Sequence, residues 1–571
     1  MARWLRPPAD PALVSSLASQ LQIPEPLARI LVLRGLADPE QAQRFLHPSL
    51  SHFHDPYRML GMRTAVERIR QACARGEKIL IYGDYDVDGS TAVVLLRKVI
   101  ELAGGQADFY IPHRLKDGYG MREEVIEEAG RRGVGLIISV DTGIREAAVV
   151  ERARQLGIDT IITDHHLPDA ANPQGPGALA VLNPNQPGCD YPEKNLCGVG
   201  VVFKLAHALL GSLDWPAARL ERVLESALRI VAIGTVADVV PLTGENRTIV
   251  KFGLDALRRP VNPGLQALLA SAGIARGQAP TAGEIAFWLA PRLNAAGRMD
   301  TANDVIELFT ATEPQRAGEI AARLNDLNAE RQQAEKGILG EVLERLREGL
   351  DPASRCLIAA GEGWHRGVLG IVASRLVERF YRPTVVISVD SEEGVAYGSG
   401  RSIRPFHLLE ALESMPELFL RFGGHRQAAG FSLPAERLPE FRSRFEAFAA
   451  ARLNAEDCVP ELRIDAEVAL AEITDASMNA LGDLAPYGFG NPEPVFAAAG
   501  LTLSSEPRLL KDKHLRLALR QHGRSITAIG WNLGTRAAEL HAGALVNAAF
   551  TVEADDYAGG WRLVLKDLIT R

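Results

Sequence analysis

Short apolar runs and helical stretches alternate between Lys78 and Asp238, which predicts a sheet of parallel strands covered by helices. The segment Thr91–Leu102 has helical spacing, and the apolar run Ile230–Val236 is interpreted as a further strand. The other predicted strands are Lys78–Tyr82, Ala107–Ile111, Leu136–Val140 and Asp159–Thr163. The pattern therefore indicates a doubly wound, parallel-sheet α/β domain.

Apolar positions recur at helical spacing from about Thr312 to Gly349, which predicts a long connecting helix. Beyond it, two predicted strands, Arg355–Ala360 and Pro383–Val389, flank a helix over Leu369–Arg379 and indicate a second α/β domain. From about Glu461 the pattern changes to short strands, which predict a small OB-type β-barrel: Leu515–Arg520, Ser525–Trp531, Leu545–Val552 and Trp561–Leu565.

These patterns predict five parts along the chain. They are an N-terminal helical segment (1–50), an α/β domain (51–255), a helical connector (256–350), a second α/β domain (351–455) and a β-barrel (456–571). Helical spacing at Pro11–Leu21 and Pro26–Leu36 supports the first part, but no function follows from it.

The composition is that of an ordinary globular protein. Of the 571 residues, 47% are hydrophobic and 23% are charged, and no apolar run has the length of a membrane span. The first residues lack the apolar stretch of a secretory signal, so we expect a cytoplasmic protein that does not bind membranes. The five cysteines form no CxxC pair, which indicates reduced thiols rather than a disulfide framework or a zinc-thiolate site.

The net charge of −8 argues against a nucleic-acid partner, but the charge is unevenly distributed. Between Leu501 and Gly530 basic residues exceed acidic ones: Arg508, Lys511, Lys513, Arg516, Arg520 and Arg524 against Glu506 and Asp512. This stretch is either a solvated strand face or a basic groove for single-stranded nucleic acid. Trp531 and Tyr557 either stack on bases or fill the core, and we expect Trp531 in the core.

Three carboxylates at alternate positions follow the first predicted strand, in Asp84-Tyr85-Asp86-Val87-Asp88-Gly89. Crowded carboxylates repel one another, so a divalent cation is the simplest explanation for them. The same spacing opens a calcium-binding EF-hand, but the twelfth position, which requires glutamate there, is Leu95. A preceding strand also disagrees with an EF-hand, so a catalytic metal site is favoured.

Further acidic and imidazole side chains follow the other predicted strands. Asp141 follows one strand, Asp164-His165-His166 follows the next, and Asp238 follows the run Ile230–Val236. Residues at the carboxyl ends of parallel strands meet in one crevice. Each motif alone is typical of a capping aspartate or a core histidine, but four together predict a metal site. Aspartate oxygens with imidazoles favour Mn²⁺ or Mg²⁺, and two ions fit this number of ligands.

These acidic motifs resemble the four motifs of the DHH phosphoesterase family: Asp84–Gly89, Asp141, Asp164–His166 and Gly234–Leu242. Five further segments resemble those that distinguish the RecJ nucleases within that family: Asn294–Arg298, Leu324–Asn328 with Arg331-Gln332, Gly398–Ser402, Gly423–His425 and Pro486–Pro492. The matching segments extend over most of the chain.

The resemblance implies a role for each matching residue. The implied metal ligands are Asp86, Asp88, Asp141, His165 and Asp238, with Asp141 between two ions and Asp84 as an outer ligand or a residue behind the ligands. Asp164 would orient the imidazoles, and His166 would contact the scissile phosphate. The implied substrate-binding residues are Arg114, Arg298, Ser399, Arg401 and His425, of which Arg114, Ser399 and Arg401 would hold a 5′-terminal phosphate. For Arg114 a surface salt bridge remains an equal alternative.

The resemblance also implies an activity: a single-stranded-DNA-specific 5′ to 3′ exonuclease that releases 5′-mononucleotides by two-metal hydrolysis, in DNA recombination and repair. The expected partner is single-stranded DNA with a 5′ end, with a helicase and a single-strand-binding protein as candidates, and we expect a monomer. Two alternatives stay open. A DHH phosphatase or phosphodiesterase for small nucleotides would lack the barrel, and an inactive relative that serves as a replication scaffold would lack metal ligands.

Overall fold

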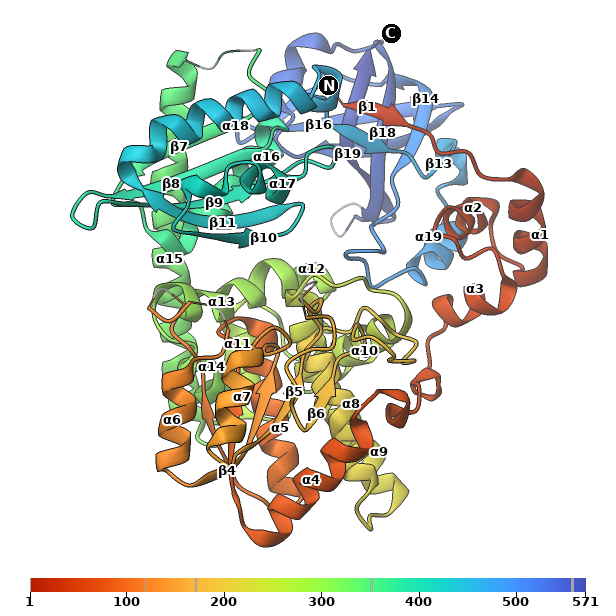
Figure 1. Ribbon diagram of the computed structural model, residues 1–571. Coiled ribbons are helices and arrows are strands. Elements are labelled where there is room, and N and C mark those ends of the chain that lie inside the picture. Colours follow the sequence, from red (N-terminus) through yellow and green to blue (C-terminus); the bar gives the residue numbers. More distant parts are fainter. Residues whose placement is uncertain are drawn as a thin grey trace. The chain divides into compact units, whose positions relative to one another are not determined.

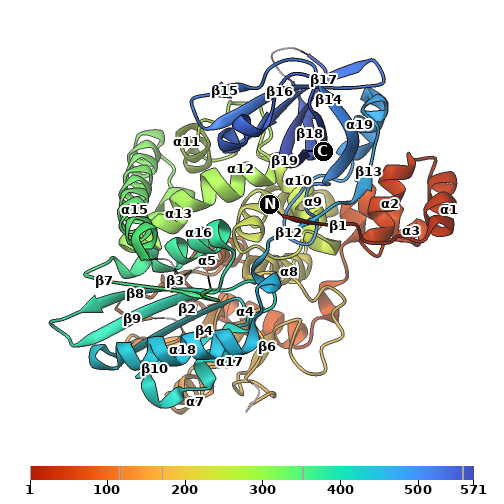
Figure 2. The same ribbon diagram turned by 90° about the horizontal axis from the view of Figure 1, so that it is seen from above.

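The computed structural model describes residues 2–114, 116–118, 120–169, 172–349, 351, 353–555 and 559–570. They form two compact units, each built from separate stretches of the chain. Unit 1 comprises Met1–Phe53, Val239–Lys251 and Pro460–Arg571, and unit 2 comprises His54–Asp238 and Phe252–Val459. Figures 1 and 2 show the elements from two directions. In this described part of the chain, no helix has both the length and the apolarity of a membrane span.

Unit 2 begins with a parallel five-stranded sheet in the order β3-β2-β4-β5-β6. Its strands are mostly buried, as expected for a parallel sheet with helices on both faces. The strands are β2 (Lys78–Tyr82), β3 (Ala107–Tyr110), β4 (Val134–Val140), β5 (Asp159–Thr163) and β6 (Ala180–Leu182). The helices are α4 (Met62–Arg75), α5 (Val87–Leu102), α6 (Glu123–Arg131), α7 (Ala147–Gln155), α8 (Gly198–Gly211) and α9 (Ala217–Ala237). The predicted doubly wound α/β fold is confirmed, with β6 as an additional strand.

The interpretation of Ile230–Val236 as a strand was wrong, because this run is the end of helix α9. Leu228, Val231, Ala232 and Val236 are buried at helical spacing, so the core selects a helix despite the β-branched residues. Helix α5 also starts earlier than predicted. Asp86 caps it by accepting a hydrogen bond from the Gly89 N–H, so the helix begins at Val87.

A helical connector leads to the second sheet of unit 2. It contains α10 (Gly244–Ala256), which starts in unit 1, then α11 (Pro263–Ser271), α12 (Ala282–Glu284), a π-helix (Ile285–Leu289), α13 (Ala290–Met299), α14 (Asn303–Thr310) and the long α15 (Pro314–Gly349). The second sheet has the order β10-β11-β9-β8-β7, with only the β7–β8 pair parallel. Its elements are β7 (Leu357–Glu362), α16 (Leu369–Phe380), β8 (Thr384–Asp390), β9 (Val395–Arg401), α17 (Leu408–Glu413), β10 (Arg421–Gly424), β11 (Ala428–Pro434) and α18 (Leu438–Arg452).

The C-terminal part of unit 1 is a β-barrel. Its seven strands have the order β13-β14-β18-β19-β17-β16-β15, and a further β14–β16 pairing closes the barrel. They are β13 (Ala466–Glu467), β14 (Phe496–Leu503), β15 (Arg508–Leu510), β16 (His514–Gln521), β17 (Arg524–Gly530), β18 (Leu545–Ala554) and β19 (Trp561–Thr570). The predicted barrel is confirmed, but Trp531 is 51% exposed and does not fill its core. Trp531 follows the end of β17, where the alternation of inward and outward residues stops. Tyr557 lies outside the described residues.

The N-terminal segment packs against the barrel core. It contains β1 (Arg3–Leu5), α1 (Pro11–Leu21), α2 (Glu25–Leu33) and α3 (Pro39–Leu46), while β12 (Glu461–Arg463) and α19 (Asp475–Gly482) precede the barrel. Strand β1 pairs with β12, and Leu17, Leu27 and Phe45 share one hydrophobic cluster with barrel residues such as Phe550. The segment is therefore an integral part of unit 1.

A buried arginine connects three separate stretches of unit 1 through hydrogen bonds. Arg247 of α10 is only 1% exposed, and its guanidinium lies 3.9 Å from the centre of the Phe45 ring. It donates hydrogen bonds to the backbone carbonyls of Phe45, Asp483, Leu484 and Ala485, at 2.6, 2.7, 2.9 and 2.9 Å respectively. One side chain thus satisfies four carbonyl groups from α3 and from the turn after α19.

We predict that Arg247→Met destabilises unit 1 by about 3 kcal/mol, because four buried carbonyls lose their donors. Chemical denaturation and limited proteolysis of the full chain would measure this loss. Arg44→Met is the matched control, since Arg44 is 61% exposed and its ion pair is with the exposed Glu40. Equal stability of the two variants would contradict the assigned role of Arg247.

Candidate metal centre

The carboxyl ends of three adjacent strands bring most of the predicted site residues together. Asp84 follows β2, Asp141 follows β4, and Asp164-His165-His166 follow β5. Asp238 joins them from a different element, because it caps the C-terminus of helix α9. The sequence thus identified Asp238 as a neighbour of the other residues but assigned it to the wrong element.

Helix α5 positions Asp86 and Asp88, and helix α8 contacts Asp88. Asp86 caps α5, and Asp88 lies in its first turn with 1% exposure. The N–H groups of Gly198 and Val199, at the start of α8, donate to the two oxygens of Asp88 at 2.6 and 2.8 Å. A Cβ atom at Gly198 would lie only 2.6 Å from Asp141. Glycine therefore allows the N-terminus of α8 to approach two carboxylates at once, and its dipole favours their negative charge.

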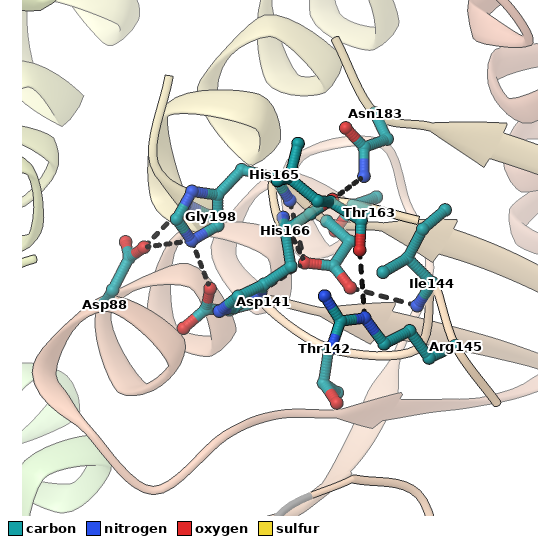
Figure 3. Close-up of polar contacts among 12 residues, drawn as sticks. Asp88, Asp141, Thr142, Ile144, Arg145, Thr163, His165, His166, Asn183 and Gly198 are labelled. Atoms are coloured by element: carbon teal, nitrogen blue, oxygen red, sulfur yellow. Dashed lines mark hydrogen bonds and ion pairs between the residues drawn. The ribbon is translucent and has the colours of Figure 1, made fainter. Parts of the chain in front are cut away.

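Asp141 and His165 lie at the middle of the cluster. Asp141 is buried and has a positive φ of 62°, a conformation that aspartate tolerates better than most residues. The Nε2 atom of His165 lies 3.2 Å from Asp141 Oδ1, 3.7 Å from Asp238 Oδ2 and 4.0 Å from Asp88 Oδ2. Figure 3 shows the His165 ring between Asp88 and Asp141. One imidazole nitrogen thus faces three carboxylates.

Burial and mutual repulsion change the acidity of this cluster. Burial, reinforced by the charge of Asp86, raises the pKa of Asp84 to about 8 and that of Asp88 to about 7. Burial and the neighbouring carboxylates also raise the pKa values of Asp141 and Asp238 well above the usual range. Burial and the charge of His166 lower the pKa of His165 to about 4, so its imidazole is neutral at neutral pH. Without a bound cation, the cluster therefore keeps protons on part of its carboxyl groups up to neutral pH, because so many buried negative charges repel one another.

The donor atoms fit divalent cations. Asp84 Oδ1, Asp141 Oδ1, Asp238 Oδ2 and His165 Nε2 are buried without a hydrogen-bond partner, although buried polar atoms normally have one. Three groups of side chains each place their ligand atoms within 4.8 Å of one another: Asp84, Asp86 and Asp141; Asp88, His165 and Asp238; and Asp141, His165 and His166. Asp141 belongs to two of these groups, which is the arrangement that two neighbouring ions sharing a ligand require.

Asp164 organises the two histidines. Its Oδ1 accepts the N–H groups of His165 and His166 at 2.7 and 3.1 Å and lies 2.7 Å from His166 Nδ1, while Oδ2 accepts the Ile144 N–H. Burial disfavours the charge of Asp164, but the His166 hydrogen bond and the charges of both histidines outweigh it and lower its pKa to about 2. Asp164 is thus an anion that fixes the His166 imidazole and the backbone of both histidines.

Two asparagines that the sequence analysis did not identify support the same loop. The Asn183 and Asn185 side chains donate to the carbonyls of His166 and His165, at 2.9 and 2.8 Å. Gly198 was also missed, although a glycine at the start of the apolar stretch Gly198–Gly211 is a signal for a helix that approaches other backbone closely. The asparagines have no such signal, because only the fold brings them to the histidines.

Three arginines gather beside the carboxylate cluster. The Arg114 guanidinium lies 4.8 Å from the Tyr85 ring centre, and Arg298 donates to the Gly367 carbonyl at 2.9 Å. Burial, together with the charges of Arg114, Arg331 and Arg401, lowers the pKa of Arg298 to about 9. Within the described residues, Arg114, Arg298 and Arg401 form no ion pair. The salt bridge considered for Arg114 is therefore absent there, and these cations can accept an external anion.

Ser399 and Arg401 lie next to the N-terminus of helix α16. Both are on β9 and point to the same face, with Arg401 Nη1 3.4 Å from Ser399 Oγ. A Cβ atom at Gly370 of α16 would lie 2.7 Å from Arg401 Nη2 and 3.0 Å from Ser399 Oγ. A hydroxyl group, a guanidinium and the first turn of a helix thus meet, which is a combination suited to phosphate.

A cavity of about 790 Å³ extends from Asp164 and His166 to the second sheet. Arg114, Asp164 and His166 line one part of it, and His425, after β10, lines another. Arg145, Glu146 and Arg421 also line this cavity and were not identified from the sequence. Most of the predicted site residues therefore contact one another or share this cavity.

Three stretches of the chain match family models. Residues 78–235 match the DHH family N-terminal domain, residues 353–451 the DHHA1 domain and residues 464–567 the RecJ OB domain. These stretches coincide with the first sheet and its helices, the second sheet and the barrel.

Curated relatives match over nearly the whole chain. The single-stranded-DNA-specific exonuclease RecJ of Bacillus subtilis (strain 168) is 40% identical over 573 residues, which cover 99% of this chain and 70% of the relative. The protein of the same name from Escherichia coli (strain K12) is 35% identical, with 94% of each chain covered.

Solved structures agree with these relatives. RecJ from Thermus thermophilus in complex with Mn²⁺ matches with a TM-score of 0.84 and 30% identity, covering 100% of this chain and 80% of that chain. The complex of the same protein with Mg²⁺ matches with a TM-score of 0.78 and 29% identity, covering 99% and 78%.

We predict that the metal-free protein loses stability as the pH rises from about 5 to about 8. The raised pKa values of Asp84 and Asp88 mean that the folded protein holds more protons than the unfolded chain in this range, so folding is favoured at low pH and weakened as these protons leave. Thermal denaturation in chelator should show a decrease of about 5 °C or more in Tm.

Asp141→Asn should flatten this pH dependence, because the amide removes one charge and, like aspartate, tolerates a positive φ. Asp255→Asn, at an exposed position, is the control. Saturating Mn²⁺ should abolish the decrease in the wild type. An unchanged slope in Asp141→Asn would show that the cluster is not its source.

Proposed function

The chain belongs to the RecJ family of single-stranded-DNA-specific exonucleases, and we propose that it degrades single-stranded DNA from the 5′ end to 5′-mononucleotides, in DNA recombination and repair. The observation that supports this most strongly is the combination, in the same unit, of a carboxylate–histidine cluster with three arginines that form no ion pair in the described part of the chain. The first suits phosphodiester hydrolysis, and the second suits a terminal phosphate.

The cluster fits two Mn²⁺ or Mg²⁺ ions. Asp86, Asp88, Asp141, His165 and Asp238 would hold them, with Asp141 shared and Asp84 at the edge of the site. When bound, the ions supply Lewis acidity that activates water and neutralises charge on the phosphate. The chain provides neutral His165 and hard carboxylate oxygens, a donor set typical of these metals. The Asp88 hydrogen bonds to α8 keep one carboxylate fixed before an ion binds.

His166 is the residue we assign to the scissile phosphate. Its Nδ1 is engaged by Asp164, and we assign Nε2 as the nitrogen that donates to a phosphate oxygen. The ring lines the 790 Å³ cavity, where a nucleotide has room. Asp164 acts through His166 by fixing the orientation of its ring. A positioned donor of this kind stabilises charge that develops on the phosphate in the transition state.

The arginines would explain why the enzyme acts at a 5′-phosphorylated end of the DNA strand. A terminal phosphate carries a charge of about −1.5 to −2, more than an internal phosphodiester, and thus gains more from several guanidinium groups. We assign this group to Arg114, Ser399 and Arg401, with Arg298 next to them and His425 on the cavity wall. Holding the 5′-phosphate at a fixed distance from the metal cluster would place the first internucleotide bond at the reacting position.

We further propose that the enzyme acts as a monomer in the cytoplasm, where a helicase supplies its single strands and a single-strand-binding protein is a partner. A 5′ end in a duplex must first be unwound, which is the reaction of a helicase. The free cysteines suit a reducing compartment. A small-nucleotide phosphodiesterase would not need the barrel, and the candidate metal ligands required for catalysis are all present.

We predict that the wild type, with Mn²⁺, releases mononucleotides from single-stranded DNA starting at the 5′ end. Asp141→Asn and His166→Ala should each lower kcat by about 100-fold or more. The first variant loses a negative charge that would compensate the metal ions, and the second loses a hydrogen-bond donor to the phosphate in the transition state. Rapid-quench assays with DNA labelled at either end would measure both rate and polarity. Asp255→Asn should retain wild-type activity. Hydrolysis of mononucleotide esters without degradation of DNA would favour the small-substrate alternative.

We also predict that Arg401→Ala reduces the preference for a 5′-phosphate over a 5′-hydroxyl end by about 10- to 100-fold, the value of one or two charged hydrogen bonds. Competition between the two substrates gives the ratio of kcat/KM directly. Arg404→Ala, an exposed arginine nearby in sequence, is the control and should keep the preference. A ratio unaffected by Arg401→Ala would remove it from the phosphate site.

A further inference from the structure

A row of two glycines crosses the second sheet next to Ser399. Ser399 of β9 lies opposite Gly430 of β11, and Gly430 lies opposite Gly423 of β10. Directly paired residues point to the same face of a sheet, so the row continues the face that carries Ser399 and Arg401. Figure 1 shows β9, β11 and β10 in this order. We call Gly430 and Gly423 the glycine floor.

The glycine floor lies open to the cavity of about 790 Å³, which both glycines line. Among the described atoms, a Cβ at Gly423 would meet none within 4 Å, and one at Gly430 would meet the Gly398 carbonyl at 3.8 Å. The packing of the chain therefore does not require glycine here, although glycine weakens a strand and often marks the close approach of a ligand. Strands lie about 4.8 Å apart, so the row from Ser399 to Gly423 spans about 10 Å, roughly the length of a nucleotide from its phosphate to the far edge of its base.

An arginine and a glutamate lie at the far end of the glycine floor. Arg421 is two residues before Gly423 on β10 and points to the same face. A Cβ atom at Gly118 would lie 3.8 Å from Arg421 Nη1, and a Cβ atom at Gly120 would overlap the Glu146 carboxylate. The guanidinium of Arg421 and the carboxylate of Glu146 therefore approach the same short segment of the chain, from opposite walls of the cavity.

These charged groups are close to one another but are not paired. Arg421 is near enough for its charge to lower the pKa of Glu146, against the larger effect of burial, which raises this pKa. The Met121 N–H donates to the Glu146 carboxylate, and Arg145 Nε donates to the Leu167 carbonyl at 2.9 Å, so the backbone holds both side chains. Within the described ranges, no ion pair joins Glu146 to Arg145 or Arg421. A ligand with both donors and acceptors on one edge fits such a set.

Guanine is the base whose edges match these groups. A carboxylate accepts hydrogen bonds and a guanidinium donates them. Guanine carries two neighbouring donors, its N1–H and its amino group, and two acceptors, O6 and N7. Adenine and cytosine have an acceptor directly beside the amino group, which would face the carboxylate and repel it. Thymine has a single N–H between two carbonyl groups, so it offers the carboxylate one donor and two repulsive neighbours.

We propose that the glycine floor, with Arg145, Glu146 and Arg421 at its end, holds the base of the 5′-terminal nucleotide and favours guanine. The choice of a 5′-phosphorylated nucleotide as the ligand rests on the proposed function. The base lies flat over Gly423, Glu146 accepts from its N1–H and amino group, and the arginines donate to O6 and N7. No bond is formed or broken here, so the subsite acts on affinity, as a lower KM for strands that begin with guanine.

The first test is the binding of the four deoxynucleoside 5′-monophosphates, measured by isothermal titration in chelator, where no hydrolysis occurs. The wild type should bind dGMP about 10-fold more tightly than dAMP, dCMP or dTMP, the value of one bidentate contact to a base. Glu146→Gln should remove this preference, because an amide offers one acceptor and one donor in place of two acceptors. Glu151→Gln, at an exposed position of helix α7, is the matched control and should keep the preference.

The second test fills the glycine floor. Gly423→Val places a side chain that strands favour into open space, so the variant should fold, which its Tm checks. It should weaken dGMP binding to the level of deoxyribose 5-phosphate, a ligand that has the phosphate and the sugar but no base. The binding of deoxyribose 5-phosphate itself should not change. Arg401→Ala should weaken all four nucleotides by the same factor, because its assigned contact is with the phosphate.

The outcomes separate this inference from the proposed function. Equal Kd values of the four nucleotides for the wild type overturn the guanine subsite. A preference for dGMP that survives both Glu146→Gln and Gly423→Val overturns it as well, because the base then lies elsewhere. The proposed function fails by a different result, the absence of DNA cleavage by the wild type with Mn²⁺. Since nucleotide binding is measured without hydrolysis, its result stands whichever way the cleavage assay falls.

Discussion

Repulsion among buried carboxylates is the constraint on which the rest of unit 2 depends. Asp84, Asp88 and Asp141 are each nearly inaccessible, and no cation of the chain pairs with them among the described residues. The fold offsets part of this cost with neutral and dipolar groups: the first N–H groups of α8 contact Asp88, and His165 remains uncharged. The negative charge of the carboxylates is therefore only partly compensated by the chain, and divalent ions can bind strongly because they supply the missing positive charge.

The buried carboxylates are partly compensated by nearby groups, whereas several arginines lack an acidic partner. Among the residues that the structure describes, this applies to Arg114, Arg298 and Arg401 in unit 2, and to Arg508 and Arg516 in unit 1. The acidic total of −8 is therefore no measure of what the chain binds. Many exposed arginines pair with nearby glutamates, so those that remain unpaired are the informative ones.

The sequence predicted the elements that follow from short-range pattern and missed what depends on tertiary contacts. The strands before Asp84, Asp141 and Asp164 were identified because a parallel sheet buried on both faces has apolar strands and polar strand ends. Asp238 was assigned to the end of a strand because a short apolar run such as Ile230–Val236 is compatible with either a buried strand or a buried helix. Only its packing in the folded protein selects the helix. Trp531 was assigned to the core by its type, whereas its position in a turn decides its exposure. Gly198 and Asn183 required the fold itself.

The construction of unit 1 from both ends of the chain imposes an order on its synthesis. Strand β1 and helices α1 to α3 leave the ribosome first, but their partners β12, α19 and the barrel strands follow roughly 400 residues later, which takes roughly 20–80 s of translation. Leu27, Ile30 and Leu31, fully buried in the finished protein, have no barrel to cover them during that time. Unit 2 can fold in the interval, because all of its residues precede Pro460. The nascent N-terminal helices thus keep these apolar side chains exposed until the last part of the chain has been made.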